Sequence, residues 1–144
     1  DMTRAGPAGG LAGGLHAFLG AELLAGSELV LDITGMRERV PTADLILVGE
    51  GRMDGSTFWG KGAAAIAREA QASGVAVMAL VGQLGEDVPD LSSLGILGVE
   101  TLLRYADSEA QAIDRAREII PTATEAAIKR FAEDYNCASR VEKP

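Results

Sequence analysis

The stretch VGEGRMDGSTFWGKG, residues 48–62, places charged, hydroxyl and glycine residues directly after an apolar run. Arg52 offers a planar fork of donors that suits a carboxylate or a phosphate. Glu50 and Asp54 are an even number of positions apart, so an extended loop could point both to one side. There they could hold Mg²⁺ or accept a proton from a hydroxyl. The stretch therefore predicts a site for a small anionic ligand.

Two further polar residues, Thr57 and Lys61, fall where a helix is expected to start, and a helix start favours an anion. Gly55 and, four residues later, Gly60-Lys61 also resemble a phosphate-binding loop, G-x-x-x-x-G-K-[ST]. In such a loop the first glycine follows its strand directly and a hydroxyl residue follows the lysine. Here the glycine comes late and Gly62 replaces the hydroxyl residue, so we expect no phosphate loop of this kind.

The same spacing permits a purely structural interpretation. Charged residues between a strand and a helix commonly lie in solvent or cap the helix, and Asp54 with Thr57 could do so. On spacing alone, both interpretations stay open.

The composition limits the class of partner. The 144 residues carry 13 basic and 21 acidic side chains, a formal net charge of −8, and no segment gathers Lys and Arg beside aromatic residues. Binding to nucleic acid or to an anionic membrane needs the opposite charge, so we expect neither partner. One Cys and one His exclude an internal disulfide and a two-histidine zinc site. With no apolar run of about 18 residues, we expect a cytoplasmic protein that binds a small molecule.

The elements that position the polar stretch alternate along the chain. Apolar runs predict strands at residues 45–48, 75–82 and 98–103, the first buried on both faces. Helices are predicted at residues 60–74, 110–120 (capped by Ser108) and 121–135 (begun or kinked by Pro121). This alternation predicts an α/β fold, a three-layer α/β/α domain with a mostly parallel sheet. Ligands of such folds bind beyond the carboxyl ends of the strands, where Gly49 and Gly51 lie.

The amino-terminal stretch is glycine-rich although its apolar residues recur at helical spacing. Glycine inside a helix costs about 1 kcal/mol against alanine. Gly9, Gly10, Gly13 and Gly14 therefore need a reason, and the interpretation we favour is close approach of the backbone to a ligand or partner. Ser27 is expected to cap a second, short helix.

Taken together, these motifs resemble one family. GEGRMDGSTFWGK is similar to the GEGR-[IL]-D-x-Q-[ST]-x-x-GK signature of bacterial glycerate kinases of the glycerate-2-kinase type. GPAGGLAGGL resembles the family's G-A-A-G-G-L-G-A-G-L, and the segment between the two motifs follows the family in the same order. The likeness covers residues 6–135, and several ordered motifs are far more specific than a lone glycine pattern.

The resemblance implies ATP-dependent transfer of phosphate to glycerate with Mg²⁺, in an α/β domain whose active site lies in a cleft against a second domain. It gives Arg52, Asp54 and Lys61 as catalytic candidates, and Glu50 and Asp54 as candidate magnesium ligands. The candidates for binding substrate or phosphate come from the amino-terminal glycine stretch and from the end of the first predicted strand. They are Gly9, Gly10, Gly13, Gly49, Glu50, Gly51 and Thr57.

The sequence also departs from the family. Ser56 replaces a glutamine, Gln83 stands where a serine is common, and no proline follows Gly60-Lys61. Family members are much longer, and their D-S-F-K-G-S segment and second domain have no counterpart here. We therefore expect residues 1–135 to be a single α/β domain, the carboxyl-terminal portion of a glycerate kinase, and residues 136–144 a tail.

Two functions stay open at this stage. In one, the chain is a glycerate kinase domain that is inactive without an amino-terminal segment or a complementing amino-terminal chain, because phosphoryl transfer depends on positioned, metal-held phosphates. In the other, it is a free-standing non-catalytic α/β module that binds a small anionic metabolite. An exposed apolar sheet edge would also favour a homo-oligomer.

Overall fold

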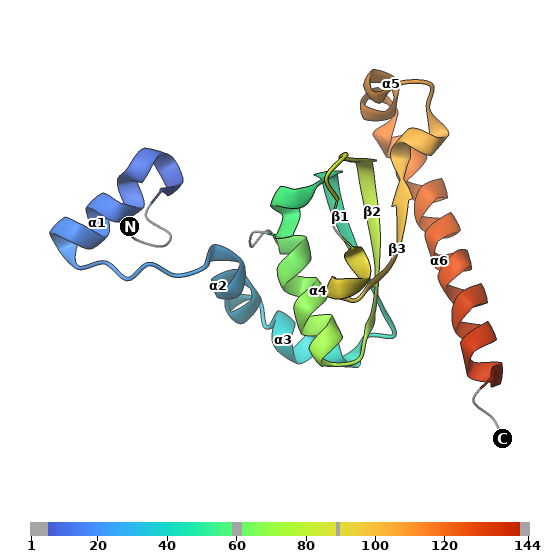
Figure 1. Ribbon diagram of the computed structural model, residues 1–144, viewed down its shortest axis with the longest axis horizontal. Helices are drawn as coiled ribbons and strands as arrows, with labels where there is room; N and C mark the ends of the chain where they lie inside the picture. Colours follow the sequence, from blue (N-terminus) through green and yellow to red (C-terminus); the bar gives the residue numbers. More distant parts are fainter. Residues whose placement is uncertain (1–5, 59–61, 89, 142–144) are drawn as a thin grey trace. The chain divides into compact units, whose positions relative to one another are not determined.

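The computed structural model describes residues 6–58, 62–88 and 90–141. The chain divides into two compact units, Asp1–Met36 and Arg37–Pro144 (Figure 1). The sequence does not indicate this division, because the residues before it form helices and not the polar linker that usually marks a boundary. Each unit is described by itself below.

The first unit consists of short helices. A 3₁₀ helix η1 (Pro7–Gly10) precedes α1 (Leu11–Leu19), and α2 (Gly26–Ile33) follows. Gly9 and Gly10 have φ values of 67° and 90°, so they form the turn before α1 rather than part of it. This turn accounts for two of the four glycines by backbone conformation alone, since positive φ favours glycine.

The prediction that Ser27 caps the second helix is wrong. The N-cap of α2 is Ala25, which makes no side-chain cap hydrogen bond, and Ser27 lies inside the first turn. The helix therefore starts two residues earlier than it would with Ser27 as the N-cap.

The second unit contains a parallel sheet with the order β1-β2-β3. Its strands are β1 (Leu45–Met53), β2 (Ala76–Leu84) and β3 (Ile96–Thr101). This arrangement confirms the predicted α/β class. The prediction that the first strand ends near Val48 is wrong, because backbone pairing with β2 continues through Met53. GEGRM is thus strand and not loop.

Helices cover both faces of the sheet. Helix α4 (Gly62–Ala72) packs on β1 and β2, whereas α5 (Glu109–Asp114) and α6 (Ala116–Val141) lie on the other side (Figure 1). Helix α3 (Met36–Arg39) begins at the last residue of the first unit, and the short helices of the second unit are η2 (Val40–Thr42), η3 (Gly55–Phe58), η4 (Leu91–Leu94) and η5 (Leu102–Tyr105).

The caps and breaks of the last two helices are partly as predicted. Ser108 caps α5, and its hydroxyl oxygen accepts from the N–H of Gln111 at 3.2 Å. The break, however, lies at Arg115, and Pro121 stands inside α6. Helix α6 also extends to Val141, past residue 135, where the tail is expected to begin.

The core lies between the sheet and its helices. In β2, Val77, Met78, Ala79 and Val81 are buried. Buried alanines of α4 and α6 face the sheet layers: Ala63, Ala64, Ala65, Ala67, Ala70, Ala123 and Ala127. Strand β1 is not buried on both faces as predicted, because it is an edge strand and Leu47 is 40% exposed.

Candidate functional site

A cavity of about 650 Å³ opens at the carboxyl ends of the strands. Its lining comes from the last residues of β1 and β2, from η5, from α5 and from the first turns of α6. All of these elements belong to the second unit. In parallel α/β sheets this is the edge at which ligands bind.

Glycines form the sheet side of the cavity. Gly49, Gly51 and Gly82 all line it. At Gly82, an added Cβ would lie 2.3 Å from the carbonyl oxygen of Gly51, so the two strands approach each other closely there. The same addition at Gly51 would meet nothing within 4 Å. Of the three glycines that line the cavity, Gly82 is the one at which packing requires glycine.

The polar residues after β1 form a defined turn. The Asp54 Oδ1 atom accepts hydrogen bonds from the Ser56 backbone N–H at 2.9 Å and from the Ser56 hydroxyl at 2.6 Å. The buried Thr57 hydroxyl oxygen accepts from the Asp54 N–H at 3.2 Å. These are the contacts expected if Asp54 and Thr57 have the structural role of capping a helix. Asp54 and Thr57 therefore hold η3 in place, whatever else they do.

The second carboxylate oxygen of Asp54 lies toward Arg52. Asp54 Oδ2 and Arg52 Nε are 3.6 Å apart, and the Arg52 side chain is 55% exposed. The guanidinium is therefore accessible to a ligand, and Arg52 is also one of the residues that line the cavity. An exposed guanidinium held by a carboxylate can bind a carboxylate or phosphate of a ligand.

The loop after β2 brings in a residue that sequence reasoning missed. The Gly85 N–H donates to the Met53 carbonyl at 2.8 Å, which ties the two loops together. A Cβ on Gly85 would lie 2.8 Å from Asp54 Cβ and 3.4 Å from Asp87 Oδ1. Asp87 therefore lies close to Asp54. The signal in the sequence was the pair of glycines, Gly55 and Gly85, that follow consecutive strands.

The other predicted residues are distributed as follows. Glu50 lines the cavity from β1, and Lys61 falls outside the described residues. Gly9, Gly10 and Gly13 belong to the first unit. In the part of the chain that the structure describes, no group of three or more His, Cys, Asp or Glu residues could hold a metal ion. Two carboxylate residues, Asp54 and Asp87, lie close together.

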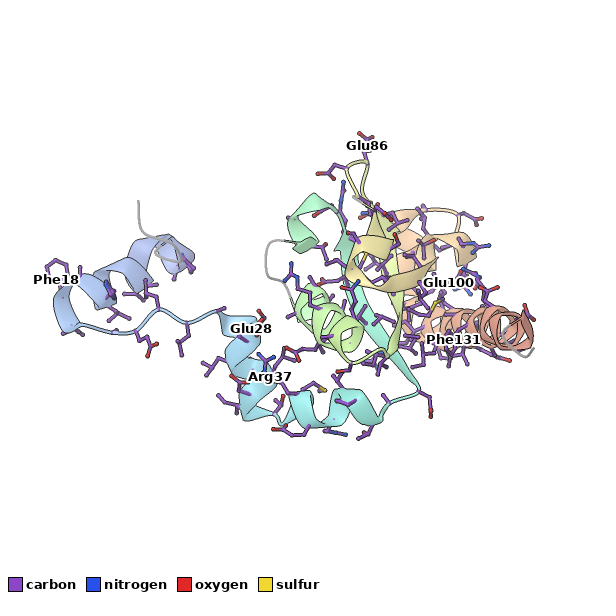
Figure 2. The ribbon with its side chains drawn as sticks, turned by 60° about the horizontal axis from the view of Figure 1, so that its bottom comes forward. Phe18, Glu28, Arg37, Glu86, Glu100 and Phe131 are labelled. Atoms are coloured by element: carbon purple, nitrogen blue, oxygen red, sulfur yellow. The ribbon has the colours of Figure 1, made fainter. Side chains whose placement is uncertain are left out.

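A buried carboxylate lies beyond the cavity. Glu100 of β3 is fully buried between the sheet and α6, whereas Glu86 extends outward from the loop after β2 (Figure 2). Glu100 accepts hydrogen bonds from Arg104 at 3.1 Å, from the Tyr105 hydroxyl at 3.2 Å and from Arg130 of α6. Burial, and then the charge of Glu100, raise the pKa of Tyr105. This network was not predicted from the sequence, and it joins β3 to α6.

Among the described residues, the structure contains no helix with the length and hydrophobicity that a membrane span needs.

The decisive comparison is with protein families: the model of the glycerate kinase family matches residues 1–132. The chain belongs to the glycerate kinase family. This confirms the resemblance seen in the sequence.

Individual glycerate kinases agree with the family match. The chain is 39% identical over 123 residues to the glycerate kinase of Halalkalibacterium halodurans, covering 85% of this chain and 32% of that protein. It is 36% identical over 103 residues to glycerate 2-kinase of Escherichia coli, covering 72% of this chain and 27% of that protein. The chain therefore spans about a third of the length of these glycerate kinases.

A solved structure supports the fold. A putative glycerate kinase 2 from Salmonella typhimurium is 28% identical and superimposes with a TM-score of 0.58, covering 89% of this chain and 33% of that one. The α/β arrangement is thus shared with this solved structure.

Proposed function

We propose that this chain carries part of the catalytic site of a glycerate kinase that transfers phosphate from ATP to glycerate. The observation that carries the proposal is that Arg52 and Asp54, both on the family signature, lie 3.6 Å apart at the carboxyl end of β1, where Arg52 lines the cavity. Parallel α/β sheets bind their ligands at this edge.

The roles follow from the chemistry of the side chains. The guanidinium of Arg52 binds the glycerate carboxylate or the transferred phosphate, because its donors match planar oxygen pairs. Asp54 orients Arg52 and fixes the turn that carries Thr57. Lys61, on the same signature, adds a positive charge for phosphate. Glu50 and Asp54 remain the candidates for accepting the hydroxyl proton of glycerate.

The residues near β1 also fit a magnesium ion that is held mainly by phosphates. Mg²⁺ in such sites uses one or two protein carboxylates and keeps several waters. Asp54 would supply one carboxylate and Asp87, close to it, would supply another, while Glu50 lines the cavity. Bound Mg²⁺ would neutralise charge on the phosphates of ATP.

Turnover needs more than this chain. Phosphoryl transfer depends on the positioning of both substrates, and residues 1–144 correspond to about a third of the related enzymes. The proposal therefore includes further segments, in the same chain or in a complementing amino-terminal chain. The alternative is a non-catalytic module that binds a small anion. The capping hydrogen bonds of Asp54 to Ser56 favour that alternative, because they give the carboxylate a structural task.

A chimera tests the proposal. Residues 1–132 replace the matching third of the Halalkalibacterium halodurans glycerate kinase, and ADP formation from ATP is measured with and without glycerate. We expect glycerate-dependent turnover, and a loss of at least about a hundredfold in Arg52→Ala, as expected for a group that binds charge in the transition state. The isolated chain should show no transfer. A folded chimera without turnover, or with normal turnover after Arg52→Ala, would overturn the proposal.

A further inference from the structure

The cavity differs from the polar cluster beside it because its walls are apolar. Leu80, Leu103, Ile113 and Ile120 line it together with alanines of α5 and α6. Three of these side chains are exposed, Leu103 by 38%, Ile113 by 69% and Ile120 by 42%. Large exposed apolar side chains around a hollow mark a surface that binds a ligand or partner.

The floor of the cavity is open backbone. Gly49 and Gly51 alternate along β1 and therefore face the same side of the sheet. A Cβ at Gly51 would meet nothing within 4 Å, and one at Gly49 would meet only the Leu80 carbonyl oxygen at 3.7 Å. Packing does not require glycine at either position, although glycine weakens a strand. Close approach of a flat ligand explains both glycines.

The charges at the cavity narrow the class of ligand. The residues that line the cavity include the acidic Glu50 and Glu109 and the basic Arg52, so the lining has no excess of basic residues. The Glu109 carboxylate also accepts from the Gln83 side-chain amide at 2.9 Å. An apolar hollow with this balance disfavours an anion inside it. It favours a neutral, planar group with a few polar atoms at its edge.

The volume of the cavity also favours a neutral, planar ligand. The volume of about 650 Å³ lies within the range of roughly 300–1,000 Å³ for sites that enclose drug-sized ligands. Glycerate, with three carbons and a carboxylate, is both too small and too polar for such a hollow. A nucleoside has the right size, a planar base and no charge.

We propose that the cavity binds the nucleoside part of the phosphate donor, with the base on the floor formed by Gly49 and Gly51. Leu103 and Ile113 cover the base from the helical side, and the phosphates leave the cavity at the Arg52 end. This inference rests on the proposed function, which supplies a nucleotide as the donor. It assigns the nucleotide to the cavity and leaves glycerate to the polar cluster around Arg52 and Asp54.

The test is a titration of this chain, labelled with ¹⁵N, by adenosine, ATP and glycerate in separate experiments. Adenosine carries no phosphate, so a response to it reports the cavity alone. We expect saturable shifts of the Gly49, Gly51 and Gly82 amide signals with adenosine and with ATP, and no such shifts with glycerate.

One variant blocks the floor. Gly51→Val adds a β-branched side chain where the surroundings leave space, so the fold should persist while the cavity fills. We expect adenosine binding to weaken by roughly tenfold or more. Leu97→Val is the matched control, since Leu97 is an exposed strand residue of β3 outside the cavity lining. Its binding should equal that of the wild type.

Several outcomes would overturn the assignment. Absence of a saturable adenosine response, an unchanged response in Gly51→Val, or glycerate shifting the floor glycines would each do so. Shifts of these signals with protein concentration alone would show that a second copy of the chain covers the cavity instead. Adenosine binding without turnover in the chimera would leave the cavity assignment standing and count against the kinase proposal.

Discussion

The carbonyl oxygen of Gly51 lies 2.3 Å from the position that a Cβ on Gly82 would occupy. No side chain fits between β1 and β2 at this point, so Gly82→Ala must push the strands apart. We expect the free energy of unfolding to fall by about 1–3 kcal/mol, as for other overpacked sites. Urea denaturation measures it.

Gly51→Ala is the matched control for this prediction. An added Cβ at Gly51 meets nothing within 4 Å, and alanine removes some of the freedom of the unfolded chain. Its unfolding midpoint should equal or exceed that of the wild type. Equal losses in both variants would contradict the steric explanation.

The pattern of hydrophobicity predicted the bounds of the buried strand β2 well, but it predicted the edge strand β1 too short. The apolar run of β2 marks a central strand with helices on both faces, and its position was found almost to the residue. The second half of β1 contains Gly49, Glu50, Gly51 and Arg52, which no pattern of hydrophobicity identifies as strand. Backbone pairing with β2 holds it, and such pairing is not visible in one sequence.

The buried Glu100 carboxylate makes a second prediction. Its partners are Arg104, Tyr105 and Arg130, so Glu100→Gln leaves guanidinium groups without their counter-charge. Breaking a buried ion pair on one side typically costs about 3–5 kcal/mol. Because Arg104 and Arg130 are partly exposed and can turn toward solvent, we expect roughly 2–3 kcal/mol, measured by urea denaturation.

An exposed pair of the same type is the control. Glu125 and Lys129 form an ion pair one turn apart on α6, with both side chains about two-thirds exposed. Glu125→Gln should leave the free energy of unfolding close to that of the wild type, because exposed ion pairs contribute little. Similar effects at Glu100 and Glu125 would show that burial does not determine the cost.

The raised pKa of Tyr105 predicts how stability changes at high pH. Burial and the charge of Glu100 raise its pKa above the ordinary value of 10.0. The folded chain therefore holds the phenol proton more tightly than the unfolded chain, so this contribution to stability is complete below pH 10 and is lost as the pH rises through the folded pKa. Tyrosinate absorbance near 295 nm, compared with Tyr105→Phe, should reveal the late titration. Glu100→Gln should lower the Tyr105 pKa toward its usual value.

The candidate site was predicted in part, for a physical reason. The residue types after the first apolar run indicate anion chemistry whatever the local backbone conformation, so the sequence could name Arg52, Asp54 and Thr57 as candidates, and their roles stay predictions. Asp87 and the apolar cavity could not, because they depend on how closely two loops and α5 approach the sheet. Close approach is a property of packing, and glycines such as Gly85 only hint at it.

Variants of Asp54 can distinguish a residue that only caps η3 from one that also takes part in catalysis. Its Oδ1 atom accepts two hydrogen bonds from Ser56, and asparagine retains that acceptor while removing the charge. Asp54→Asn should therefore stay within about 0.5 kcal/mol of the wild type in stability, whereas Asp54→Ala loses the cap and should cost about 1 kcal/mol. If the carboxylate also orients Arg52 and serves the metal, Asp54→Asn in the chimera should still lose most of its glycerate-dependent turnover. Normal turnover together with normal stability would leave Asp54 a capping residue only.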